Sequence, residues 1–221
     1  MDKIKSIAEL TTLGRVRLSR HFFMREMLTS EIGNFCGVPN LPDDPDLAIE
    51  VGKHLCELLL EPLHSKFGHV SIRSAFRSSS LNAFGNELFN AGDKSARCAP
   101  NSYNDSRHTW DRRDAQGYMG GCATIFIPAY LDYFQQSDDW RALGWWIRDW
   151  LPQHDEVIFF DHLGAFNLRW YEGPNQSPIL HLPDGSADFS TQTVLTCRGW
   201  ANFEGDHSSL YAPALRQMGL A

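Results

Sequence analysis

The order of its predicted helices and strands makes this chain an α+β protein with a small, antiparallel-leaning central sheet flanked by helices. Three observations predict this class: a helical stripe of apolar residues over 45–68, a compact apolar run over 122–128, and two strand-like runs around the turn DHLG. The stripe consists of Leu47, Val51, Leu55, Leu59 and Leu63. We expect a single domain over residues 1–221.

The first third of the chain contains two predicted helices. Ser19 is expected to cap a short helix through RHFFMREMLTS. Asp44 and Pro45 suit the cap and first turn of the longer helix, because proline fixes a helical φ and needs no amide hydrogen there. This helix should end near Gly68, and Pro62 should kink its last turn.

An alternating strand over residues 70–76 follows and ends in Arg77 and a serine-rich polar turn. Residues 85–118 are rich in Gly, Asn, Ser and Arg and lack a sustained period, which predicts a long polar loop. Loops of this length are usually functional or disordered.

CATIFIP, residues 122–128, is typical of a central strand. One or two helices should follow, with Asp138 or Asp139 near a start. Beyond them, DEVIFF and AFNLRWY predict a strand pair, and PILHLP and TVLTC are shorter strand-like pieces. Four residues at helical spacing are expected in the core: Trp146, Ile147, Trp150 and Leu151.

Composition excludes several classes of function. The 221 residues carry a net charge of -7, which argues against a surface built to bind nucleic acid. The N-terminus has no apolar leader and no later window is long enough to cross a bilayer, so we expect a cytoplasmic protein without membrane contact. The five cysteines form no CxxC pair and are expected to be reduced, with Cys56 and Cys122 in the core.

Two polar residues could carry chemistry. Arg77 at a strand end offers a planar fork of donors that matches a carboxylate, although a solvent-facing arginine before a turn is the alternative. His108 lies in the long polar loop with Asp105, Asp111 and Asp114 nearby. Imidazole nitrogen and carboxylate oxygen are zinc ligands, whereas a solvated loop histidine is the alternative.

Four segments in succession, LSRHFFMREMLTS, VPNLP, LLEPLHSKFGHVSIRSAFRSSSLN and SRH, resemble the N-terminal motifs of the zinc D-alanyl-D-alanine carboxypeptidase family. That family includes bacterial dipeptidases and phage endolysin peptidases and shares its fold with the Hedgehog signalling domain. The resemblance covers about residues 18–171 and leaves 172–221 as a C-terminal extension. It implies that Arg77 contacts the substrate and that Ser106 and His108 form the serine-x-histidine motif, with His108 as a zinc ligand.

The later motifs depart from the family pattern. Thr124 occupies the place of an aspartate ligand, and Asn167 that of a histidine ligand, while Phe160 or Asp161 falls at the general base. Hydroxyl and amide groups are poor zinc ligands. Asp114 is an alternative for the aspartate, but its spacing from His108 is one residue short.

Two functions follow from this comparison. The preferred one is a non-catalytic or altered-chemistry domain that binds a small peptide-like or carboxylate-bearing ligand and needs no cofactor. Its predicted pocket consists of Ser74, Arg77, Ser106, His108 and Asn167. The alternative is a zinc-dependent peptidase or amidase in which His108, Asp114 and His162 hold the metal, with Asp161 as base and Arg77 holding the substrate carboxylate. The oligomeric state is left open.

Overall fold

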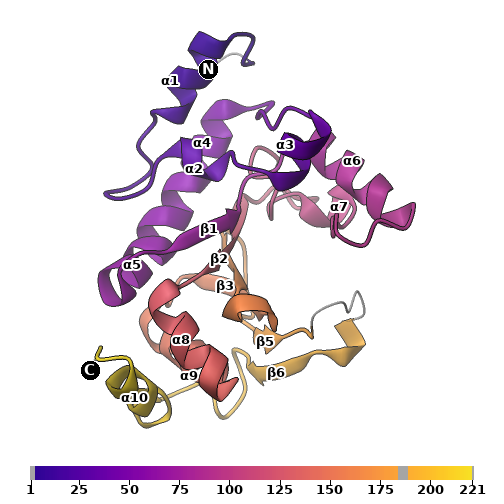
Figure 1. Cartoon of the computed structure of the whole chain (residues 1–221). Coiled ribbons are helices and arrows are strands. Elements are labelled where there is room, and N and C mark those ends of the chain that lie inside the picture. The colour runs from indigo at the N-terminus through magenta and orange to yellow at the C-terminus, as the bar shows by residue number, and fades with distance from the viewer. Residues whose placement is uncertain (1–2, 184–188, 221) are drawn as a thin grey trace. The chain divides into compact units, whose positions relative to one another are not determined.

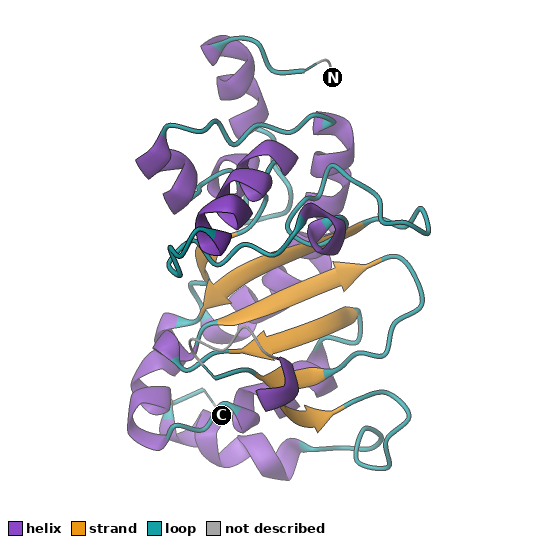
Figure 2. Cartoon of the chain, turned by 90° about the vertical axis from the view of Figure 1, so that its right-hand side faces the viewer, coloured by secondary structure: helices purple, strands orange, loops and turns teal. Residues whose placement is uncertain are grey.

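The computed structural model describes residues 3–183 and 189–220, and it confirms the α+β class. Six strands form one open, mixed sheet in the order β1-β2-β4-β3-β5-β6 (Figures 1 and 2). In this order β1 (Ser71–Ser74) neighbours β2 (Gly120–Phe126).

The chain divides into two compact units. The first comprises the described residues up to Glu57, together with Ile72–Ala123 and Tyr171–Gly173. The second comprises Leu58–Ser71, Thr124–Trp170 and the described residues from Pro174 onward.

The first unit contains the predicted long helix, and local chemistry explains its start. The Asp44 side chain accepts a hydrogen bond from Leu47 N at 3.1 Å, and Pro45 is the first helical residue, as predicted. The other helices of this unit are α1 (Ile7–Gly14), α2 (Met24–Met27), α3 (Glu31–Cys36), α6 (Ser79–Asn90) and α7 (Asn101–Asn104), beside α4 (Pro45–Leu55).

The prediction that Ser19 caps the early helix is wrong. The amides of Leu18 and Ser19 both donate to Phe22 O, which closes a tight turn, and α2 begins only at Met24. The Glu26 carboxylate accepts from Phe23 N at 3.0 Å, so an acidic side chain rather than a serine hydroxyl satisfies this helix start.

The helical stripe continues past α4 through a π-helical segment, Cys56–Leu60, into α5 (Glu61–Phe67). The irregularity directly precedes Pro62, which lacks the amide hydrogen that a regular α-helix needs at that position. The helix ends where predicted, at Gly68, whose φ of 78° lies in the left-handed region.

The serines after Arg77 begin a helix rather than a turn. Ser78 has an extended backbone and its Oγ accepts from Leu81 N at 3.3 Å, so it is the N-cap of α6. The predicted loop over residues 85–118 is therefore wrong for residues 85–90 of α6 and for α7. The apolar period was hidden because α6 buries Asn82 and Gly85 beside Leu81.

The second unit contains the predicted strand pair. β3 (His154–Phe159) and β4 (Phe166–Tyr171) are antiparallel, and β3 also pairs in parallel with β5 (Ile179–His181). β6 (Thr193–Thr196) is antiparallel to β5. Two helices, α8 (Pro128–Ser137) and α9 (Arg141–Trp150), follow β2, and the sequence did not predict α10 (Ser208–Gln217).

Most of the predicted aromatic core is correct. Trp146, Ile147 and Leu151 are buried. Trp150, the last residue of α9, is instead 60% exposed. Its Nε1 hydrogen is donated to Tyr211 OH at 3.0 Å. All five cysteines are free thiols, and Cys56 and Cys122 are buried as expected. Over the residues described, no helix is both long and apolar enough to cross a bilayer.

Candidate ligand-binding site around Arg77

Arg77 lies between the end of β1 and the N-cap of α6. Its amide donates to His108 O at 2.8 Å, and the His108 Nδ1–H donates to Ala75 O at 2.9 Å. These two hydrogen bonds fix the strand end against the segment that contains His108. Both residues belong to the first unit, so one compact body holds them together.

The guanidinium of Arg77 is half-buried and surrounded by neutral groups. Nη1 donates to Asn82 Oδ1 at 3.0 Å and to Cys98 Sγ at 3.2 Å, and Nη2 donates to Ser74 Oγ at 3.3 Å. Among the described residues no carboxylate forms an ion pair with it. Three of its five N–H donors are therefore used, and the part of the chain that the structure describes provides no counter-ion for its charge.

Asn82 fixes the position of this guanidinium. Its side chain is fully buried, and its Nδ2 donates to Ala99 O at 2.9 Å and to Asn101 Oδ1 at 2.7 Å. Its Oδ1 also accepts from Asn104 Nδ2 at 3.1 Å. Because every polar atom of the amide is engaged, its oxygen faces Arg77 in one defined orientation.

Cys98 completes the neutral surroundings. Its thiol donates to Ala96 O at 3.1 Å, and burial raises its pKa above the usual thiol range, so it does not supply a negative charge to Arg77. A Cβ at Gly85 would lie 2.5 Å from Cys98 Sγ. Glycine is therefore needed at this position of α6 for the thiol to approach.

His108 is neutral at physiological pH. Its side chain is 8% exposed, and burial, with the charges of Arg77 and Arg107 as smaller causes, lowers its pKa to about 3. The preceding Ser106 is fully buried with a φ of 57°, and its amide donates to Arg112 O at 3.0 Å, so it shapes the loop before His108.

The acidic residues near His108 have structural partners. Asp114 Oδ1 accepts from the amides of Gln116 and Tyr118, each at 2.9 Å, and its Oδ2 accepts from Tyr171 OH. Asp111 Oδ2 accepts from Asp43 N at 2.6 Å.

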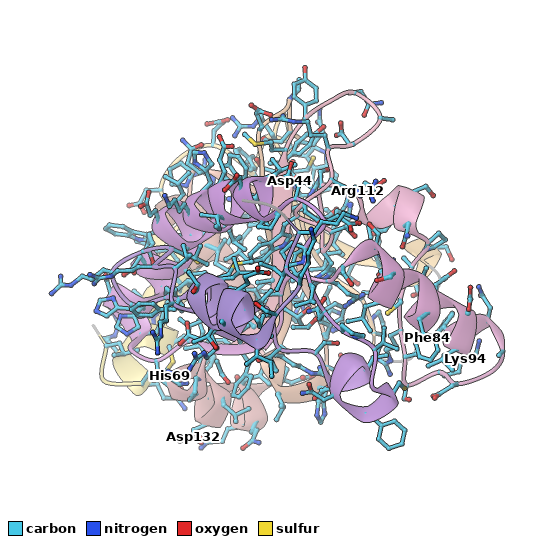
Figure 3. All side chains as sticks on the ribbon, turned by 90° about the horizontal axis from the view of Figure 1, so that it is seen from above. Asp44, His69, Phe84, Lys94, Arg112 and Asp132 are labelled. Carbon is cyan, nitrogen blue, oxygen red and sulfur yellow. The ribbon has the colours of Figure 1, made fainter. Side chains whose placement is uncertain are left out.

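Arg112, like Asp111, is bonded to the segment that precedes α4 (Figure 3). Its Nη2 donates to Asp43 Oδ2 at 3.1 Å. Burial raises the pKa of Asp105 and Asp111. Asp111 and Arg112 therefore tie the polar loop to the start of α4.

The remaining predicted site residues belong to the second unit. Thr124 Oγ1 donates to Asn167 Oδ1 at 2.6 Å, and both side chains are half-buried. The two residues for which the family resemblance expects zinc ligands are thus hydrogen-bonded to each other.

Asp161 forms a pair with a histidine that the sequence did not single out. His181 Nε2 and Asp161 Oδ1 are 2.6 Å apart, and the His181 ring stacks on Trp140 with 5.4 Å between centroids. His162 beside it is exposed. The pair was missed because it depends on the parallel register of β5, which sets His181 opposite Phe159.

Within either unit taken alone, the described residues provide no group of three His, Cys, Asp or Glu ligand atoms close enough to share a metal ion. In the second unit, Glu61 and His64 lie one turn apart on α5 and offer two ligand atoms within 4.8 Å of each other. Such a pair could contribute to a metal site, but a structural zinc needs four ligands and a catalytic zinc three.

No family model matches the chain, and neither the curated proteins nor the solved structures contain a significant match to it. The residues of the chain and their geometry therefore carry the functional assignment.

Proposed function

We propose that this chain is a ligand-binding protein that holds the carboxylate of a small ligand at Arg77. The observation that carries the proposal is the half-buried guanidinium with three neutral acceptors and no carboxylate partner among the described residues. A partly buried charge is costly unless it is paired, and a carboxylate matches the guanidinium fork. A ligand carboxylate would supply the missing counter-ion.

The absence of family-type catalysis is the second part of the proposal. It is supported by the hydrogen bond between Thr124 and Asn167, since a hydroxyl and an amide that pair with each other are poor candidates for zinc ligands. The resemblance to the zinc D-alanyl-D-alanine carboxypeptidases is compatible with this view, because it implies that Arg77 contacts the substrate. A degenerate member of that fold would retain the ligand site and lose the metal.

The test uses N-acetylglycine as a carboxylate probe and N-acetylglycinamide as its uncharged counterpart, titrated by NMR at low salt. We expect only the acid to bind, and Arg77→Ala to weaken its binding by at least about 10-fold, as loss of a charge-assisted hydrogen bond requires. Arg73→Ala is the matched control, since Arg73 is exposed on β1, the strand that precedes Arg77. Equal losses in both variants, or binding of the amide as tightly as the acid, would refute a specific site at Arg77.

A zinc-dependent peptidase that uses His108, Asp114 and His162 is the second candidate. The observation in its favour is the His108 ring, whose Nδ1–H donates to a carbonyl, an arrangement common for metal-bound histidine. Against it, the Asp114 carboxylate already accepts three hydrogen bonds. Elemental analysis of protein purified without chelator should find no stoichiometric zinc. One zinc per chain, lost together with peptidase activity in His108→Ala, would favour this candidate.

A further inference from the structure

Residues 3–25 are strongly basic, although the chain as a whole carries a net charge of -7. The only acidic residue among them is Glu9, and the basic residues are Lys3, Lys5, Arg15, Arg17, Arg20 and Arg25. All six basic residues are exposed. Lys3 is paired with Asp43 at 2.7 Å, whereas none of the other five forms an ion pair with a described residue. Their charge is therefore available to an anionic partner.

The four arginines lie on a well-defined turn that joins α1 to α2 (Figure 1). Arg17 and Phe23 form an antiparallel bridge across this turn, and the Arg17 guanidinium lies 6.0 Å from the centroid of the Phe23 ring. The same guanidinium donates to Ser19 O at 3.0 Å and to Arg20 O at 2.6 Å. Arg17 thus braces the backbone from which the other arginines project.

Apolar side chains are exposed on the same surface. Ile7 is 85% exposed, and Leu10, about one turn further along α1, is 37% exposed. Phe23 in the turn is 40% exposed. A Cβ at Gly14 would lie 3.3 Å from Arg25 Nε, so the turn returns to the last residue of α1. Helix and turn therefore present basic, aliphatic and aromatic side chains together.

This combination of side chains distinguishes between two kinds of anionic partner. Single-stranded nucleic acids bind to basic grooves in which bases stack on aromatic rings. Here the Phe23 ring is already faced by Arg17, and the most exposed apolar side chain, Ile7, is aliphatic. Basic residues interspersed with exposed apolar side chains are instead typical of segments that lie in the interface of a membrane. The surface therefore fits a lipid bilayer better than a nucleic acid.

We infer that the surface formed by residues 3–25 binds a membrane that contains anionic lipids. Its unpaired basic side chains contact the headgroups, while Ile7, Leu10 and Phe23 enter the boundary between headgroups and acyl chains. Charges act over only about 8 Å at physiological salt, so acidic residues elsewhere in the chain do not cancel this attraction. The expectation of no membrane contact rested on leader and spanning segments, and surface binding requires neither. The inference is independent of the carboxylate site at Arg77.

Sedimentation of the full chain with lipid vesicles tests the inference. Vesicles of phosphatidylcholine alone are compared with vesicles in which about a third of the lipid is phosphatidylserine. We expect the wild type to bind only the anionic vesicles and to be released as sodium chloride is added. A single-stranded RNA oligonucleotide at the same salt is the competing polyanion, and its binding should be at least about 10-fold weaker.

A triple variant, Arg15→Gln with Arg20→Gln and Arg25→Gln, then locates the effect. Arg17 is left in place because it braces the turn. Since the three substitutions remove three positive charges that face the headgroups, we expect binding to the anionic vesicles to weaken by about 100-fold at low salt. Urea unfolding of the variant checks that it is folded. The comparison of vesicles by the wild type does not depend on that result.

The matched control is Arg73→Gln with Arg141→Gln and Arg216→Gln, which removes the same charge from three exposed arginines outside this surface. It should weaken binding by less than about threefold, since distant charges are screened. Ile7→Ser should weaken binding by about 10-fold, which is the order expected for burial of one apolar side chain. Leu210→Ser, at a leucine on α10 that is 51% exposed, should leave binding unchanged.

Three outcomes oppose the inference. Equal binding of the wild type to both kinds of vesicle, or binding to neither, would overturn it. Tighter binding of the RNA than of the anionic vesicles would overturn it in favour of nucleic acid as the partner. A loss in the control triple variant as large as in the first triple variant would also overturn it, because the total charge of the chain would then decide binding.

Discussion

Two arginines lie on or beside strands of the sheet, and they differ in the groups that their guanidinium groups contact. Arg169 on β4 is buried and forms an ion pair with Asp155 at 2.6 Å, across a register shift in the β3–β4 ladder. Arg77 after β1 is half-buried, and the described residues offer its guanidinium neutral acceptors and no carboxylate. A partly buried charge is costly unless it is paired, so an arginine without a protein counter-ion is the better candidate to bind an anion from solution. The contrast supports a ligand role for Arg77 and a structural role for Arg169.

The largest effect should come from breaking the structural pair. Asp155→Asn removes the carboxylate that pairs with the buried Arg169 guanidinium, and loss of one partner of a buried pair costs about 3–5 kcal/mol. Urea unfolding measures the change in the free energy of unfolding. Asp132→Asn, at an exposed site on α8 (Figure 3), should change it by less than about 0.5 kcal/mol. A loss in Asp155→Asn as small as in this control would make the two arginines equivalent.

The second prediction concerns pH. Because the folded-state pKa of His108, about 3, lies below the value of 6.5 for an unperturbed histidine, the unfolded chain takes up the proton first on acidification. The stability that neutral His108 contributes is complete above about pH 6.5 and is lost as the pH falls toward 3. One such proton accounts for at most about 1.4 kcal/mol per pH unit.

Urea unfolding at pH 4, 5, 6 and 7 measures this slope. His108→Asn should have a shallower slope than the wild type, and His69→Asn should not. Comparison of variants is needed because the raised pKa values of Asp105 and Asp111 act in the opposite direction and are common to all three proteins. Identical slopes in wild type and His108→Asn would mean that the imidazole is not neutral and buried in the folded chain.

The third prediction concerns a substitution that places a carboxylate beside Arg77, as Asp155 lies beside Arg169. Ser74 Oγ accepts from Arg77 Nη2, so Ser74→Asp places a carboxylate beside the guanidinium. We expect the affinity for N-acetylglycine to fall by about 10-fold or more, since a charge-assisted bond to the ligand is replaced by an internal one. The free energy of unfolding should change by less than about 1 kcal/mol, because the site is only half-buried.

Ser74→Asn is the matched control for this substitution, since it has nearly the same size and no charge. It should retain most of the affinity. If it weakens binding as much as Ser74→Asp does, the loss reflects the shape of the site rather than its charge.

Local signals account for what could be predicted from the sequence. Asp44 with Pro45, and Gly68 after the apolar stripe, marked helix ends because caps act within a few residues. The start of α6 was missed although Ser78 is an ordinary N-cap, because the helix buries Asn82 where an apolar residue was expected. The buried side chain of that asparagine forms hydrogen bonds with partners at residues 99–104, and no local sequence pattern reveals these contacts.

The candidate site shows the same limit. Arg77 and His108 could be named from the sequence, since their residue types and the family resemblance single them out. Asn82 and Cys98, which hold the guanidinium, could not. Asn82 stands in a segment that was expected to be a polar turn rather than a helix, and Cys98 meets Arg77 only when the segment after α6 folds back onto that helix. The partner of Asp161 depends likewise on the pairing of distant strands.

The smallest expected effect is the one that most sharpens the contrast between the two arginines. Arg77→Ala removes three hydrogen bonds to neutral acceptors, but Asn82 Oδ1 keeps its bond from Asn104, and Ser74 is half-buried, so solvent can reach its side chain. The substitution also removes a half-buried charge for which the described residues supply no counter-ion, and this offsets part of the loss. We therefore expect the free energy of unfolding to fall by less than about 1 kcal/mol, measured in urea without ligand.

In saturating N-acetylglycine the wild type should gain stability and the variant should not, because only a chain that binds the ligand is stabilised by it. A loss in Arg77→Ala as large as that in Asp155→Asn would show that Arg77, like Arg169, serves the fold.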